Sequence, residues 1–183
     1  MKIILASGSP RRSELMRLAG FDFDVVIPDV DESIPDDMPA QSAVIMLSLK
    51  KAQATLATTN EPCIVVAADT VVVLDDVILG KPSDKDDAFR MLSMLSGRTH
   101  HVFTGVTVIK NGVAGSFYSD STVTFFKLTE EEIYEYISTG EPMDKAGAYG
   151  IQGKGCLLVK ELCGDYYNIV GLPIAETARA IRD

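Results

Sequence analysis

The sequence predicts an α/β fold, and three observations lead to that prediction. Residues 65–74 form a valine-rich apolar run, interrupted by Asp69 and Thr70, which is typical of a central strand buried on both faces. Segments with apolar residues at helical spacing alternate with further strand-like segments along the chain. Asn111-Gly112 between two strand-like runs indicates a β-hairpin.

Composition limits the class of protein. The chain has 183 residues, 46% apolar and 23% charged, which predicts one globular domain, or one domain with two lobes, with a sizeable core. Its 17 basic and 26 acidic residues give a formal charge of −9, which argues against binding nucleic acid or anionic membranes. Three cysteines without a C-x-x-C pair predict reduced core thiols. Neither a signal peptide nor a membrane-spanning run is recognisable, so we expect a cytoplasmic protein.

Local patterns predict the order of the elements. Strands are expected at residues 2–6, 21–27, 65–74, 77–79, 102–109, 113–126 and 156–162. Helices are expected from Pro10 to about residue 19, over 40–58, after a capping box of Ser83 and Asp86, from Thr129 to about 138, and after 171–173. Residues 28–39 predict an acidic loop and 164–168 a turn.

Residues 7–12, with the sequence Ser-Gly-Ser-Pro-Arg-Arg, join the first strand to the first helix. Ser9 stands where it can cap the helix, and Pro10 where the helix begins. A helix start with a glycine, two hydroxyls and two arginines can bind phosphate, because its N–H groups and its dipole face the anion. An ordinary capped helix with solvated arginines also fits these residues.

Asp69 stands inside the most apolar strand. An ionised carboxylate there is costly unless it is hydrogen-bonded, paired or bound to a cation, so Asp69 is either a structural residue or a metal-binding or catalytic one. The nearby Gly80-Lys81-Pro82 resembles the end of a P-loop, but Asp75 and Pro82 replace residues that this motif requires. Lys81 is then a lysine held beside Asp69 in a turn that Pro82 stiffens.

Residues 139–155 form a second unusual stretch, in which five glycines alternate with charged and amide side chains. Loops of this kind often carry function on a rigid scaffold, although a plain glycine-rich turn would have the same composition. The chain has two histidines, His100 and His101, which point to opposite faces of a strand. We therefore expect neither a histidine metal site nor a Ser-His-Asp triad.

Together these features suit attack of water on a phosphoanhydride. A divalent cation such as Mg²⁺ is usually held by few carboxylates, here Asp69 and Glu32, together with substrate phosphates. Lys51 and Lys81 would neutralise further phosphate charge. Such a cation activates water and stabilises the charge that develops during the reaction.

The chain resembles the Maf family of nucleoside triphosphate pyrophosphatases along its whole length. The resemblance rests on motifs in the expected order, which are Leu-Ala-Ser-Gly-Ser-Pro-Arg-Arg at 5–12, Ala-Asp-Thr at 68–70, Leu-Gly-Lys-Pro at 79–82, Leu-Ser-Gly at 95–97, Asp-Lys-Ala-Gly-Ala-Tyr-Gly-Ile-Gln-Gly at 144–153 and Gly-Leu-Pro at 171–173. It implies an inosine-triphosphatase-like α/β fold over residues 1–183, with an elongated mixed β-sheet flanked by helices and two lobes around a central cleft. It also implies a homodimer.

The resemblance further implies the reaction and its residues. Water activated by Mg²⁺ or Mn²⁺ would attack the α-phosphorus of a nucleoside triphosphate, giving the monophosphate and pyrophosphate. Asp69 matches the family's catalytic acid, described as a proton acceptor. The expected catalytic residues are Asp69, Lys81, Lys51 and Glu32, with Asp69 and Glu32 at the metal. The expected substrate-binding and specificity residues are Ser7, Ser9, Arg11, Arg12, Thr70 and Gln152.

The motif around Gln152 distinguishes two branches of that family. The branch that acts on dTTP and UTP has Tyr-Gly-Ile-Gln-Gly, whereas the branch that acts on 7-methyl-GTP has Glu in place of the Gln. Gln152 therefore predicts a house-cleaning enzyme for dTTP, UTP and modified pyrimidine nucleotides, since an amide can donate to O4 and accept from N3–H of the base. Ala68 and Ser48 depart from the family pattern. The alternatives are a 7-methyl-GTP pyrophosphatase and a regulator of septum formation that binds nucleotide without turnover.

Overall fold

The computed structural model describes residues 1–183 and divides the chain into two compact units. Unit 1 comprises Met1–Thr70, Thr104–Ser119 and Gly171–Asp183, and unit 2 comprises Val71–Phe103 and Asp120–Val170. Three strands pass from one unit into the other, namely β3 (Cys63–Leu74), β5 (Thr99–Lys110) and β6 (Val113–Phe125). None of the helices has the length and apolar character that crossing a membrane requires.

The remaining elements each belong to one unit. Unit 1 contains β1 (Lys2–Ala6), α1 (Pro10–Leu18), β2 (Asp24–Val26), α2 (Ala40–Ala57) and α6 (Ile174–Arg182). Unit 2 contains β4 (Val77–Leu79), α3 (Lys85–Leu95), α4 (Glu130–Ser138), the 3₁₀ helices η1 (Glu141–Asp144), η2 (Ala146–Ala148) and η3 (Gly153–Leu158), then β7 (Val159–Cys163) and α5 (Tyr166–Val170).

The strands form one seven-stranded sheet in the order β2-β1-β3-β5-β6-β7, with β4 paired to β3. β1 is parallel to β2 and β3, whereas β4 is antiparallel to β3 and β7 is antiparallel to β6. The sheet is therefore mixed, and the predicted α/β class is confirmed. β3 lies inside the sheet, as its valine-rich sequence predicts.

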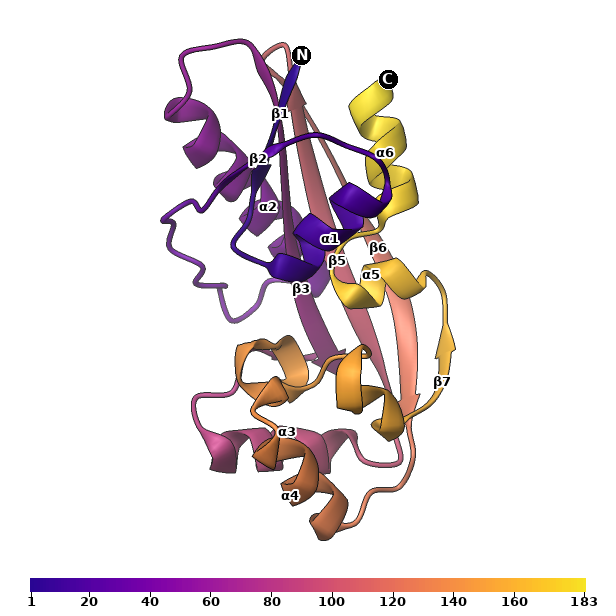
Figure 1. The fold of residues 1–183 in the computed structure, drawn as a ribbon. Coiled ribbons are helices and arrows are strands. Elements are labelled where there is room, and N and C mark those ends of the chain that lie inside the picture. Colours follow the sequence, from indigo (N-terminus) through magenta and orange to yellow (C-terminus); the bar gives the residue numbers. More distant parts are fainter. The chain divides into compact units, whose positions relative to one another are not determined.

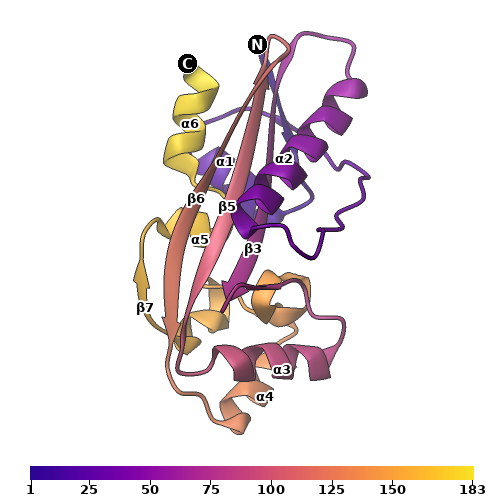
Figure 2. The same cartoon turned by 180° about the vertical axis from the view of Figure 1, so that it is seen from behind.

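In unit 1, helices cover both faces of the sheet. α2 lies on one face, and α1 and α6 lie on the other (Figures 1 and 2). α2 approaches β5 closely, since a Cβ added at Gly105 would lie 2.4 Å from the main chain of Val44. A buried cluster packs in this unit, formed by Ile4, Ala6, Ala52, Cys63, Val65, Ala67 and Ile109. This packing fixes the position of α2 relative to the strands of unit 1.

In unit 2, α3 and α4 pack through Phe89 and Tyr134, whose rings stack with centroids 4.7 Å apart. The predicted cap of α4 is confirmed, because the Thr129 hydroxyl and the Glu132 carboxylate each accept a hydrogen bond from the other's main-chain N–H. α5 is attached to the strands by Asn168, whose side chain donates to the Val102 carbonyl at 2.9 Å.

Several predicted elements are corrected by the structure. Residues 156–162 are not a buried strand, because the chain forms η3 up to Leu158 and β7 is an exposed strand paired with β6 alone. The predicted strand 21–27 is reduced to β2, and the predicted turn at 164–168 contains the start of α5. Cys156 and Cys163 are exposed, so Cys63 is the one core thiol.

The predicted cap of the helix after Ser83 is also corrected. Asp84, not Ser83, caps α3, and its carboxylate accepts from Asp87 N at 2.8 Å. The predicted hairpin is confirmed, with Asn111 and Gly112 at φ of 53° and 77°.

Candidate active site

The buried carboxylate of unit 1 is held by a lysine. Asp69 on β3 and Lys51 on α2 are 9% and 8% exposed, and Lys51 Nζ donates to Asp69 Oδ1 at 2.6 Å. The same Nζ lies 2.8 Å from Glu32 Oε1, on a side chain that is 52% exposed. One ammonium group therefore joins a buried carboxylate to an exposed one. The charge of Asp69 is met by a cation, as burial of an ionised group requires.

The acidic loop at 28–39 is attached to α2 through neighbouring lysines. Lys51 pairs with Glu32, and Lys50 Nζ donates to the Asp31 carbonyl at 2.5 Å. Consecutive side chains on a helix point about 100° apart, so Lys50 lies toward solvent while Lys51 points toward the sheet. Of the two adjacent lysines, only Lys51 is therefore directed toward Asp69.

The Arg12 guanidinium donates its hydrogen bonds to groups of the protein itself. Its Nε donates to the Gly171 carbonyl at 2.8 Å, one Nη donates to Ser7 Oγ at 3.2 Å and the other to Thr70 Oγ1 at 3.1 Å. Burial lowers the pKa of Arg12, while the negative charge of Asp69 acts in the opposite direction. The forked side chain connects the residue after β1, a residue inside β3 and the turn before α6, and it fixes the orientation of the two hydroxyls.

The start of α1 has the composition of an anion site, with Gly8, two serines and two arginines. Ser9 is at the predicted N-cap position, but its hydroxyl makes no capping hydrogen bond. Its main-chain N–H donates to Ser7 Oγ at 3.2 Å, and Ser7 is buried. Arg11, in the first turn, is half-buried. The Ser9 hydroxyl therefore does not cap the N-terminal end of α1, where the helix dipole favours an anion.

Lys81 and Gln152 belong to unit 2, whereas the other predicted site residues belong to unit 1. Both side chains are exposed. Their segments meet within unit 2, because Gly147 N, in the glycine-rich stretch, donates to the Gly80 carbonyl at 3.0 Å. Gly147 has φ of 66° and a Cβ there would lie 2.9 Å from Val72, so glycine is required for this contact.

Several residues that hold the candidate side chains of each unit were not predicted from the sequence. In unit 1, Thr104 Oγ1 lies 2.9 Å from Thr70 Oγ1, and the Gly171 carbonyl accepts from Arg12. In unit 2, His100 and Tyr136 hold the glycine-rich stretch from outside, and Glu141 holds it from within. The alternation of inward and outward side chains along β5 predicts that His100 points inward. The spacing of residues does not identify its partner, Tyr149.

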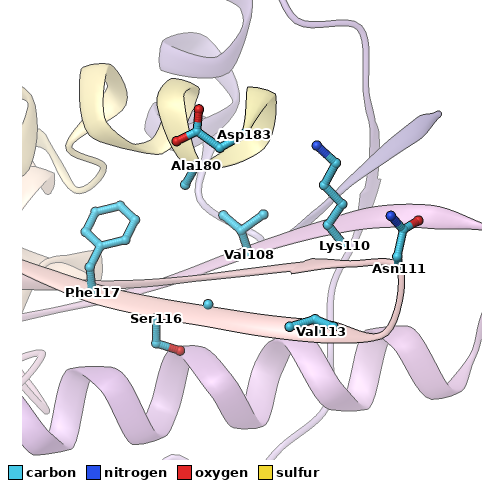
Figure 3. Close-up of a pocket in the computed structure, with 9 residues that line it drawn as sticks. Val108, Lys110, Asn111, Val113, Ser116, Phe117, Ala180 and Asp183 are labelled. Atoms are coloured by element: carbon cyan, nitrogen blue, oxygen red, sulfur yellow. The ribbon is translucent and has the colours of Figure 1, made fainter.

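A surface hollow of unit 1 contains none of the predicted site residues. It lies between the hairpin of β5 and β6 and the end of α6, as Figure 3 shows. Its lining residues are Val108, Lys110, Asn111, Val113, Gly115, Ser116, Phe117, Ala180 and Asp183. Its one lysine, Lys110, donates to the carbonyls of Ile181 and Arg182 at 3.3 and 3.4 Å. This hollow is therefore poorly suited to a triphosphate.

Comparison with known proteins connects this geometry to a family. A family model described as Maf-like protein matches residues 2–183. A dTTP/UTP pyrophosphatase of Bacillus cereus is 50% identical over 181 residues, covering 99% of this chain and 94% of the relative. A dTTP/UTP pyrophosphatase of Bacillus cytotoxicus is 51% identical with the same coverage. The structure of a HAM1 protein from Coxiella burnetii shares the fold, with a TM-score of 0.53, 14% identity, and coverage of 100% of this chain and 98% of that one.

Proposed function

The chain belongs to the Maf-like protein family, and we propose that it hydrolyses dTTP and UTP to the nucleoside monophosphate and pyrophosphate. Half of its residues are identical to those of relatives named dTTP/UTP pyrophosphatase across 99% of the chain. Modified pyrimidine nucleotides are included in the proposal, as expected of a house-cleaning enzyme. The observation that carries it is the contact of Lys51 with both Asp69 and Glu32.

The side chains of unit 1 are assigned the following roles. Asp69 accepts the proton of the attacking water, because it is a carboxylate held in place by Lys51. Arg11 and the first-turn N–H groups of α1 bind phosphate oxygens. Arg12 is a positioning residue, since its guanidinium donates to Ser7, Thr70 and Gly171.

Asp69 and Glu32 form a donor set that fits a divalent cation. They are hard oxygen ligands that converge on one positively charged atom, Lys51 Nζ, at 2.6 and 2.8 Å. Mg²⁺ and Mn²⁺ suit one or two carboxylates completed by substrate phosphates. We propose that these two residues hold the cation. When bound, it supplies positive charge to the phosphate oxygens and makes water easier to deprotonate.

The residues of unit 2 complete the proposal. Lys81 neutralises phosphate charge, and Gln152 reads the base through its amide. Gln152 is exposed, as a residue that contacts a ligand must be. An amide can donate to O4 and accept from N3–H of uracil or thymine, whereas a carboxylate can accept only.

The test is pyrophosphate release from dTTP, UTP, dCTP and 7-methyl-GTP, with Mg²⁺ or Mn²⁺ and with EDTA. We expect turnover of dTTP and UTP that EDTA abolishes. Preference for 7-methyl-GTP would assign the chain to the 7-methyl-GTP branch of the family. Tight binding of nucleotide without turnover would favour a regulator of septum formation. Gln152→Glu should lower kcat/KM for dTTP and UTP by about tenfold or more, because the carboxylate cannot donate to O4. Unchanged relative rates across the nucleotides would contradict the role of Gln152.

Three further expectations belong to the same proposal. Residues 1–183 act as a single catalytic domain in the cytoplasm, and two copies form a homodimer. Light scattering of the purified chain tests the dimer, with a monomer at micromolar concentration as the contrary result.

A further inference from the structure

Gln152 projects from a segment of unit 2 that is held on both sides. Its side chain is exposed and does not cap η3, which begins at the next residue. The neighbouring backbone is irregular, with Ala148 at φ of 60° and Gly153 at φ of 64°. A segment without regular secondary structure keeps one conformation only if other groups hold it, so the contacts on each side of Gln152 are decisive.

Three aromatic rings hold the segment before Gln152. Tyr149 is buried, and its hydroxyl lies 2.8 Å from Nε2 of His100, which is 1% exposed. The rings of Phe125 and Tyr149 meet edge to face, with centroids 4.7 Å apart. The next residue, Gly150, donates its N–H to the Tyr136 hydroxyl at 3.1 Å.

These anchors are uncharged near neutral pH. Burial lowers the pKa of His100 to about 4, with a smaller contribution from His101. Burial raises the pKa of Tyr136 to about 12 and raises the pKa of Tyr149 as well. The hydrogen bond between His100 and Tyr149 is therefore one between neutral groups in an apolar environment.

A single carboxylate holds the segment after Gln152. Glu141 accepts hydrogen bonds from Lys154 N at 3.1 Å and from Gly155 N at 3.4 Å, and so satisfies the start of η3. The two sides also touch each other, because a Cβ added at Gly155 would lie 2.0 Å from the Gly150 carbonyl oxygen. The main chain on both sides of Gln152 is fixed within unit 2.

We propose that His100, Tyr149 and Glu141 are positioning residues for Gln152 and thereby set the discrimination between bases. This inference rests on the proposed function, in which Gln152 reads uracil or thymine. Readout by two adjacent hydrogen bonds requires the amide to be placed within about 0.5 Å and 10–20°. A loosened anchor would weaken selection of the base more than it slows the reaction at the phosphate.

The test is Tyr149→Phe, which removes the hydroxyl and keeps the ring. We expect the ratio of kcat/KM for dTTP to that for dCTP to fall by about tenfold, with kcat for dTTP changed less than threefold. Tyr134→Phe is the matched control, because Tyr134 is 57% exposed and its ring stacks on Phe89 of α3. The control should leave the ratio unchanged. An unchanged ratio in Tyr149→Phe overturns the proposal.

A double variant tests whether the effect passes through Gln152. With Gln152→Ala already present, Tyr149→Phe should not lower the ratio further. An equal loss in both backgrounds would mean that Tyr149 acts without Gln152, against the proposal. If Tyr149→Phe does not fold, Glu141→Gln tests the anchor on the other side in the same way.

Hydrogen exchange of residues 149–155 separates this inference from the proposed function, because it requires no substrate. Exchange should be faster in Tyr149→Phe and unchanged in Tyr134→Phe. Unchanged exchange in Tyr149→Phe overturns the anchoring even if the wild-type chain is active. Absence of pyrimidine turnover in the wild type removes the proposed function and the selectivity role, whatever exchange shows.

Discussion

Units 1 and 2 hold their candidate functional side chains by different means. In unit 1 charged groups contact one another, with Lys51 between Asp69 and Glu32. In unit 2 the exposed Gln152 takes no part in such a network, and its segment is held by buried uncharged rings and by one carboxylate. An anionic substrate with a cation would add charges beside the ion pairs of Lys51 but none to the contacts that hold the segment of Gln152.

Substitutions in the two units should therefore affect different properties of the enzyme. A change of charge in unit 1 should affect catalysis or stability strongly, because the groups are close together and partly desolvated. A change of shape or hydrogen bonding in unit 2 should affect selectivity more than rate. The following predictions test this contrast.

The largest expected effect is on turnover in Asp69→Asn. The amide keeps the shape of the side chain but cannot accept a proton from water, so we expect kcat for dTTP to fall by about a hundredfold to ten-thousandfold. The measurement is steady-state pyrophosphate release, with circular dichroism to show that the fold is kept. Asp31→Asn is the control, because Asp31 is an exposed carboxylate on the same acidic loop as Glu32. This variant should keep the activity of the wild type. Full activity in Asp69→Asn would remove this residue from the mechanism.

The next effect is on stability in Lys51→Met. Removing this ammonium leaves Asp69 buried without its cation, which should cost about 3–5 kcal/mol in the free energy of unfolding at pH 7. Urea denaturation measures the loss. Lys50→Met is the matched control, because Lys50 and Asp31 have side chains 42% and 71% exposed, 3.7 Å apart, and an exposed pair contributes about 0–1 kcal/mol.

A double variant tests whether the loss of stability in Lys51→Met depends on Asp69. With Asp69→Asn present, Lys51→Met should cost markedly less, because no buried charge is then left unpaired. Equal costs with and without Asp69 would show that Lys51 stabilises the chain through packing or Glu32 and not through Asp69.

The local pattern predicts the buried aspartate but not its partner, although the family resemblance includes Lys51 among the catalytic residues. The valine-rich run is sufficient to place Asp69 inside a central strand. Lys50 and Lys51 are equivalent by composition, and only the orientation of α2 on the sheet, set by the close contact at Gly105, decides which one points inward. Tertiary packing of this kind is not encoded in any local pattern.

The same limit explains the errors in unit 2. The apolar residues at 156–162 fit a buried strand, but β7 pairs on one side only and is exposed, because strand order is a property of the whole sheet. The contact between His100 and Tyr149 joins residues 49 positions apart. Periodicity gives the inward direction of His100, whereas its partner depends on how the glycine-rich stretch folds back.

The smallest expected effect is a pH dependence specific to unit 2. Folded His100 has a pKa lowered to about 4, chiefly by burial, against an ordinary value of 6.5. Between these values the unfolded chain binds more protons than the folded one, so stability falls as the pH falls. From pH 7 to pH 5 this residue should cost about 2 kcal/mol in the free energy of unfolding, and above pH 7.5 almost nothing.

Urea denaturation at pH 7.5, 6 and 5 measures this loss in the wild type and in His100→Gln. The variant lacks the titrating ring, so its stability should change less over this range, although it starts lower because the Tyr149 contact is altered. His101→Gln is the control, because His101 is exposed on the opposite face of β5 and contacts Asp120. Parallel pH profiles for the wild type and His100→Gln would show that the neutral anchor of unit 2 is not sensitive to acid, and would remove this part of the contrast between the two units.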